Sequence, residues 1–239
     1  MASAGQALTA PQRGFVSLVW GMIRAPRPTL EWIQSDKSRR WLWMALIATL
    51  FAVLPVLVAA PAATRQVQEA MSAQFEDSTR QMPNLTPEQQ EMAMSTAANP
   101  LLITGLPAVG AVAGLWIGWL VWAGGLNILS TLVGGGSGFG QFWRTVVWCW
   151  VPYTLRGMLQ TVYILLTGEL ISNPGLSGLL TPAEPASGLM AAPPGTGFLL
   201  ARGLLTRFDL FLVWTLILLA LGVMVAARIS RRKAFLVTL

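Results

Sequence analysis

The sequence predicts an all-α, multi-pass transmembrane helix bundle, and two observations support that prediction. More than half of the 239 residues are hydrophobic and only 11% are charged, against about 25% charged in a soluble domain. Four stretches with no charge, or only one, reach the roughly 20 apolar residues that cross a bilayer as a helix. So few charges leave too little polar surface to cover a water-soluble globule, whereas lipid can cover apolar side chains.

The four predicted spans are clearly separated along the chain. The first covers residues 41–60 and the second residues 101–133, both without a charge. The second is longer than a perpendicular crossing, so we expect it to tilt, to kink near Pro107 or to project from the membrane. The third covers about residues 145–168 and contains one arginine, and the fourth covers residues 210–227. A cleaved signal peptide is the alternative for the first span, but the leader of 40 residues before it is too long for one.

Residues 1–40 form a predicted cytoplasmic segment that precedes the transmembrane bundle of residues 41–239. Apolar residues recur in this segment at helical spacing, among them Phe15, Leu18 and Met22, with arginines and tryptophans nearby. This pattern predicts an amphipathic helix that lies in the membrane interface. The alternative is an amphipathic helix that packs on the bundle.

Basic residues are distributed unevenly around the spans. Eleven of the 16 lie in residues 1–40, in residues 134–144 or in the tail after residue 227. The two predicted outer loops, about residues 61–100 and 169–208, hold four arginines and seven carboxylates. Because cytoplasmic segments are enriched in Lys and Arg, we expect both termini in the cytoplasm. The basic residues adjoin apolar spans and do not form a polar stretch that could follow phosphates, so we expect no nucleic-acid partner.

Catalytic and metal-binding groups are scarce in the sequence. Histidine is absent, which excludes Ser-His-Asp and Cys-His catalysis and any histidine-ligated metal. Cys149 is the single cysteine, so a disulfide cannot form within the chain. The Gly-rich residues 134–138 lack the Lys-Ser/Thr pair that follows a phosphate-binding loop, and they predict a hinge between two spans. We therefore expect no enzyme activity, no cofactor and no metal.

Gly110, Gly114 and Gly118 form a glycine ladder, spaced four residues apart, within the second predicted span. Such a ladder lets another helix approach closely in lipid. We expect a close helix contact at this ladder, either within the chain or between copies. A chance run of glycines is the alternative.

Arg156 is the one charge well inside a predicted span. A cation in hydrocarbon needs a partner or water. The height of Arg156 in the third span makes Asp209, at the outer start of the fourth span, its candidate partner. Two hypotheses stay open: a structural ion pair that holds the third and fourth helices together, or a substrate or ion pathway lined by Arg156.

Three stretches resemble the Yip (Ypt-interacting protein) family of multi-pass membrane proteins. They are residues 24–33 (RAPRPTLEWI), residues 134–142 (GGGSGFGQF) leading into residues 150–153 (WVPY), and residues 209–214 (DLFLVW) continuing to 221–222 (LG) and 232–234 (RKA). The resemblance implies a helix bundle with one more span than the four found here and no catalytic residues. The family's fifth span would begin near Ala234, whereas this sequence ends at Leu239, so that span is either absent or truncated.

The leading functional hypothesis is a non-enzymatic membrane scaffold or adaptor that binds other integral membrane proteins, or itself, in the lipid bilayer. The alternative is a transporter, or an accessory subunit of one, that uses Arg156, and an intramembrane enzyme is third. The composition, rich in Ala, Arg and Leu, favours a prokaryotic plasma membrane. For a eukaryotic host, the resemblance implies Golgi or endoplasmic-reticulum membranes and a Rab-type GTPase as partner.

Overall fold

Every regular element is helical in the residues that the computed structural model describes, which are 14–36, 38–81, 86, 88, 92, 95–96, 99–171, 175–179, 196–206 and 208–238. The predicted all-α fold is confirmed. Among these residues, three helical segments are long and apolar enough to cross a membrane. They are the first 34 residues of α3 (Arg40–Gln81), the segment Leu101–Leu132, which ends in α5 (Leu106–Leu132), and α9 (Leu210–Ala227).

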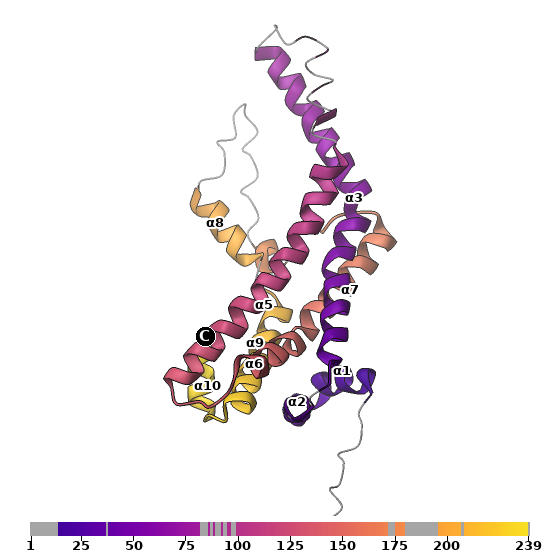
Figure 1. Ribbon diagram of the computed structural model, residues 1–239. Helices are drawn as coiled ribbons and strands as arrows, with labels where there is room; N and C mark the ends of the chain where they lie inside the picture. Colours follow the sequence, from indigo (N-terminus) through magenta and orange to yellow (C-terminus); the bar gives the residue numbers. More distant parts are fainter. Residues whose placement is uncertain are drawn as a thin grey trace, which may run out of the picture.

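Helix α3 extends well past the length that a membrane requires. Its 42 residues measure about 63 Å at a rise of 1.5 Å per residue, about twice the thickness of the hydrocarbon core. Pro55 and Pro61 lie inside the helix without ending it, as helices in membranes tolerate. Residues 61–81, which the sequence assigned to an outer loop, therefore continue the first span as helix. Figure 1 shows α3 rising beyond most of the bundle, beside the start of the second span.

The second span is irregular where a proline removes a hydrogen-bond donor. Pro107 stands in the first turn of α5, and the preceding turn, Leu101–Gly105, is π-helical. The amide of Leu106 donates to the carbonyl of Leu101, five residues back. The helix therefore has a wider turn just before Pro107, whereas the tilt, the kink and the projection from the membrane stay predictions.

The third predicted span, residues 145–168, is divided between two helices. Helix α6 (Phe139–Cys149) ends at Trp150, and α7 (Val151–Thr167) begins directly after it. Pro152 has no N–H to donate to a carbonyl of α6, and its ring disfavours helical backbone at the preceding residue. Because of this break, α7 alone has 17 residues, and three of the four predicted spans are helices long enough to cross by themselves.

Helix α6 lies at the centre of the packed core. It contacts α2 (Pro26–Ser35), α3, α5 and α9, and its residues from Thr145 to Cys149 are all buried. Four tryptophans from α5, α6 and the break before α7 pack against one another here. Their paired ring centroids are 5.4–6.3 Å apart, a favourable range for aromatic pairs. The four tryptophans are Trp116, Trp119, Trp143 and Trp150.

The amino-terminal segment forms two helices where the sequence predicted one. Helix α1 (Phe15–Arg24) and helix α2 meet at Ala25, just before a proline that starts the second helix. Leu18 and Leu30 are fully buried, and α2 lies against α6 and α9. These helices therefore pack on the bundle, the alternative that the sequence left open. Their position in the membrane interface stays a prediction.

One end of the bundle gathers segments that are distant in sequence. Helices α1, α2 and α10 (Arg231–Thr238) and the turn between α5 and α6 all lie there (Figure 1). Hydrogen bonds from basic side chains tie these segments together. Arg144 donates to the carbonyl of Asp36, and Lys233 donates to the carbonyl of Val133.

Candidate functional site

Arg156 of α7 and Asp209, the residue before α9, form an ion pair. Nη1 of Arg156 lies 3.0 Å from Oδ2 of Asp209, and the two side chains are 21% and 12% exposed. The other carboxylate oxygen of Asp209, Oδ1, accepts a hydrogen bond of 2.8 Å from the amide of Leu212. The structure thus brings together the two residues that the sequence paired. Asp209 is also the N-cap of α9.

Three neighbours that carry positive charge or donate hydrogen bonds stabilise the negative charge of Asp209. These are the Arg156 guanidinium, the Leu212 amide and the N-terminus of α9, which carries a partial positive charge of roughly +0.5. Hydrogen bonds to ionised groups are about twice as strong as neutral ones. The carboxylate therefore has a partner at each oxygen and is well suited to a low-dielectric site.

Helix α7 holds Arg156 beside aromatic rings and next to a close helix contact. The guanidinium carbon of Arg156 lies 5.9 Å from the ring centroid of Tyr153, a cation–π distance. Tyr153 in turn stacks on Trp150, with ring centroids 5.3 Å apart. The next residue, Gly157, lies against the backbone of α3, because a Cβ at that position would collide with the carbonyl oxygen of Phe51.

Two cavities flank the ion pair. One, of about 470 Å³, lies mainly between α3 and α7, and the other, of about 570 Å³, lies mainly between α7 and the start of α9. Arg156 and Gln160 line both cavities, whereas Asp209 lines the second. Arg156 and Gln160 are four residues apart and so share one face of α7. Two polar side chains therefore separate the cavities.

The positive charge of Arg156 can either be neutralised by Asp209 or face a solute in a cavity. Within the described residues, no group of three or more His, Cys, Asp or Glu comes together in the way that a metal site requires. A closed Arg156–Asp209 pair fixes α7 to the start of α9. If the pair opens, the guanidinium is presented to a solute in either cavity. The geometry is compatible with both hypotheses drawn from the sequence.

The glycine ladder faces open space within the chain. A Cβ added at Gly110, Gly114 or Gly118 would meet nothing within 4 Å among the described residues. The most hydrophobic stretch of this span has none of its residues buried inside the bundle. The expected close contact therefore does not form between the described helices of one chain, and a contact with another chain stays a proposal.

The glycines that do pack closely were missed by sequence reasoning. A Cβ at Gly222 of α9 would collide with the methyl group of Thr145 on α6, just as one at Gly157 would collide with α3. Each is a single glycine, without the repeat that marks a ladder. Gln160 was also missed, although its position one helical turn after Arg156 was a readable signal.

A family model described as the Yip1 domain matches residues 20–239 of the chain. The matched range includes the ion pair, both flanking cavities and the glycine ladder. No curated protein and no solved structure matches the chain.

If the ion pair is structural, Arg156→Ala should destabilise the bundle, because Asp209 would keep a mostly buried charge without its cationic partner. We expect a loss of about 1–3 kcal/mol in the free energy of unfolding. Asp209→Asn removes the charge but keeps a side chain that caps the helix, so the double variant should recover part of the loss. Unfolding of the purified chain in mild detergent measures this coupling as a double-mutant cycle.

The control for capping is Asp209→Ala, which removes the cap together with the charge. It should cost about 1 kcal/mol more than Asp209→Asn. Strict additivity of Arg156→Ala and Asp209→Asn would show that the two groups are uncoupled. A folded Arg156→Ala variant that has lost function would then favour the pathway hypothesis.

Proposed function

We propose a scaffolding role in a membrane for this chain, which belongs to the Yip1 domain family of membrane proteins. The family match confirms the resemblance found in three stretches between residues 24 and 234. The proposed role is non-enzymatic. The chain holds another integral membrane protein, or a second copy of itself, by helix contacts within the lipid.

The observation that carries this proposal is the open face of α5. Gly110, Gly114 and Gly118 lie along this face with nothing packed over them in the described chain. Val109 and Ile117 beside them are exposed large hydrophobic residues. Lipid tails are as apolar as such side chains, so helices associate in membranes through close packing at small residues. The ladder offers a flat strip where a second helix can approach the α5 backbone.

The energetics of glycine support a partner at this face. Each glycine inside a helix is about 0.8–1.0 kcal/mol less favourable than alanine. No described contact within the chain offsets that cost at the three ladder positions. A close contact with another chain would offset it. Other integral membrane proteins and a second copy are therefore the proposed partners, and a Rab-type GTPase is added only for a eukaryotic host.

We propose that the end of the bundle formed by α1, α2, the α5–α6 turn and α10 faces the cytoplasm. Nine of the basic residues that the structure describes belong to the segments that meet at this end, and Lys and Arg are retained on the cytoplasmic side of membrane proteins. The extension of α3 lies at the opposite end (Figure 1), and Asp209 stands at the end of α9 that is far from the basic segments. For a prokaryotic host, we propose that the bundle has this orientation in the plasma membrane.

The second candidate function is transport, alone or as an accessory subunit. It is favoured by one observation, the position of Arg156 and Gln160 between two cavities. A polar or charged side chain inside a membrane protein frequently marks a solute or ion pathway. A monodisperse chain that moves a solute by itself in liposomes would support this function over scaffolding.

The scaffold is tested by replacing Gly114 with leucine. The larger side chain fills the strip on α5, so a membrane partner that co-purifies in mild detergent from the native host should be lost. The control is Thr131→Leu, an exposed position about 25 Å further along the same helix and beyond the ladder, which should keep the partner. Mass spectrometry of the purified material measures retention, and equal retention by both variants would contradict the scaffold.

The orientation is tested by single cysteines in a Cys149→Ala background. Ser72→Cys lies on the extension of α3 and Ser230→Cys lies just before α10, and both positions are exposed. A membrane-impermeant thiol reagent should label Ser72→Cys in intact cells and Ser230→Cys only after permeabilisation. Labelling of Ser230→Cys in intact cells would reverse the proposed orientation.

A further inference from the structure

An apolar groove runs along α9, apart from the ion pair and the glycine ladder. It has a volume of about 620 Å³, within the range of sites that bind small organic molecules. Helix α9 supplies six of its lining residues, and they share one face because they recur at helical spacing. These are Val213, Leu216, Ile217, Ala220, Leu221 and Met224.

The groove has the length of one membrane leaflet. From Val213 to Met224 the helix rises about 16 Å, and half of a hydrocarbon core of about 30 Å is about 15 Å. Val213 and Ile217 are 51% and 54% exposed, so the end of the groove far from the cations is open to the surroundings of the helix. An acyl chain that enters from a leaflet would therefore have apolar contacts along its length.

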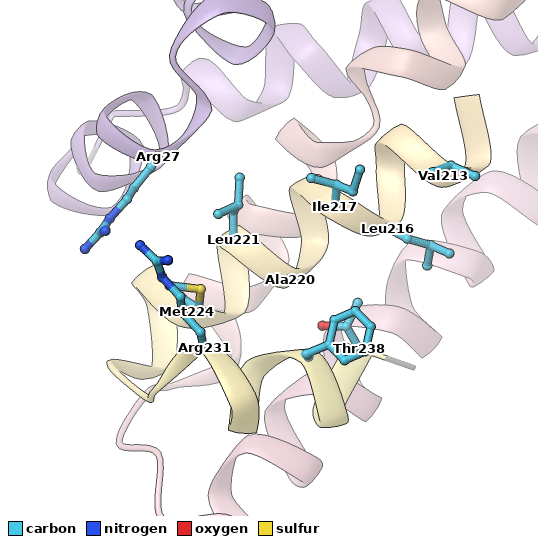
Figure 2. Close-up of a pocket in the computed structure, with 10 residues that line it drawn as sticks. Arg27, Val213, Leu216, Ile217, Ala220, Leu221, Met224, Arg231 and Thr238 are labelled. Carbon is cyan, nitrogen blue, oxygen red and sulfur yellow. The ribbon is translucent and has the colours of Figure 1, made fainter. Parts of the chain in front are cut away.

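Two cations from different helices stand at the other end of the groove. Both Arg27 of α2 and Arg231 of α10 line the groove at this end. Figure 2 shows the Arg231 guanidinium beside Met224 and the Arg27 side chain extending from α2 at the same end. Nε of Arg27 donates to Oε1 of Glu31 at 3.2 Å, which leaves the terminal N–H groups of the fork for another acceptor. No described carboxylate pairs with Arg231.

The charge at this end of the groove is positive after the nearby carboxylate is counted. Arg27 and Arg231 outnumber Glu31 by one, and the basic residues Arg228, Arg232 and Lys233 adjoin Arg231 in sequence. Guanidinium groups recognise phosphate oxygens by paired hydrogen bonds. Basic pockets at the cytoplasmic side of membrane helices bind anionic lipid headgroups. The apolar groove and its cationic end together match an amphipathic anion whose apolar chain is as long as one membrane leaflet.

We propose that this groove binds an anionic phospholipid, with its phosphate between Arg27 and Arg231 and one acyl chain along α9. The site is independent of the scaffold, because it uses neither α5 nor the Arg156–Asp209 pair. It requires only that the groove opens to a leaflet whose headgroups lie at the level of α2 and α10. The lipid would link α2, α9 and α10, three helices that meet at the basic end of the bundle.

Native mass spectrometry of the full chain in mild detergent tests this site. The probes are phosphatidylglycerol and phosphatidylcholine with identical acyl chains. We expect phosphatidylglycerol to be retained at lower concentration, and Arg27→Gln or Arg231→Gln to weaken its retention about fivefold each, the effect of one cation near an anionic lipid surface. Arg39→Gln, an exposed cation of another segment that does not line the groove, is the matched control and should change nothing.

Two further variants separate the parts of the site. Glu31→Gln removes the one carboxylate beside Arg27 and should strengthen phosphatidylglycerol retention. Ala220→Trp fills the groove and should abolish the preference for phosphatidylglycerol while the lipid-free chain melts as the parent does.

Three results would overturn the proposal. Equal retention of both lipids, unaffected by the arginine variants, would show annular lipid only. Competition by glycerol phosphate at the same concentration as the lipid would show an anion site that does not use the groove. Conversion of a dimer to a monomer by Ala220→Trp would assign the groove to a second copy of the chain.

Discussion

The backbone contact between α3 and α7 at Gly157 is the interaction on which the rest of the bundle depends. Hydrocarbon provides no hydrophobic driving force between helices, so their association relies on dispersion and on close approach. At Gly157 the α7 backbone touches the carbonyl of Phe51 so closely that no Cβ would fit. That contact fixes α7 along α3. It thereby places Arg156 between the two cavities and opposite the start of α9.

Polar side chains also hold the helices together, because in a membrane each needs a partner within the protein. Charged and amide side chains tie the loops and short helices together at the basic end, as Arg144 and Lys233 do through backbone carbonyls. Within the spans, the described ion pair is Arg156 with Asp209, where a helix N-terminus and a backbone amide complete the partners of the carboxylate. The chain thus gives the carboxylate of this ion pair a partner at each oxygen, whereas four buried side-chain atoms elsewhere in the described residues lack a hydrogen-bond partner, Gln34 Oε1, Trp119 Nε1, Asn127 Oδ1 and Thr215 Oγ1. It leaves two apolar surfaces, on α5 and on α9, for molecules outside the chain.

The sequence predicted those features that depend on local composition. Long apolar runs predict membrane helices because their residues need only be apolar, and the heights of Arg156 and Asp209 in adjacent spans predicted their proximity. The break at Trp150 was not predicted, since Pro152 is apolar and does not interrupt an apolar run. Gly157 could not be distinguished from other single glycines, because its role depends on where α3 passes. The ladder on α5 shows the converse: a clear repeat in sequence has no partner within the described chain.

The central claim is that the chain uses Gly157 for its own packing and keeps the ladder free for a partner. The most direct measurement compares the thermal unfolding of Gly157→Ala and Gly114→Ala in mild detergent, with the chain monodisperse and without a partner. The account predicts that Gly157→Ala lowers stability by about 1–3 kcal/mol, as overpacking does, whereas Gly114→Ala leaves stability unchanged or raises it by up to about 1 kcal/mol through helix propensity. A Gly157→Ala variant as stable as the parent, or a Gly114→Ala variant destabilised as much as Gly157→Ala, would contradict the claim.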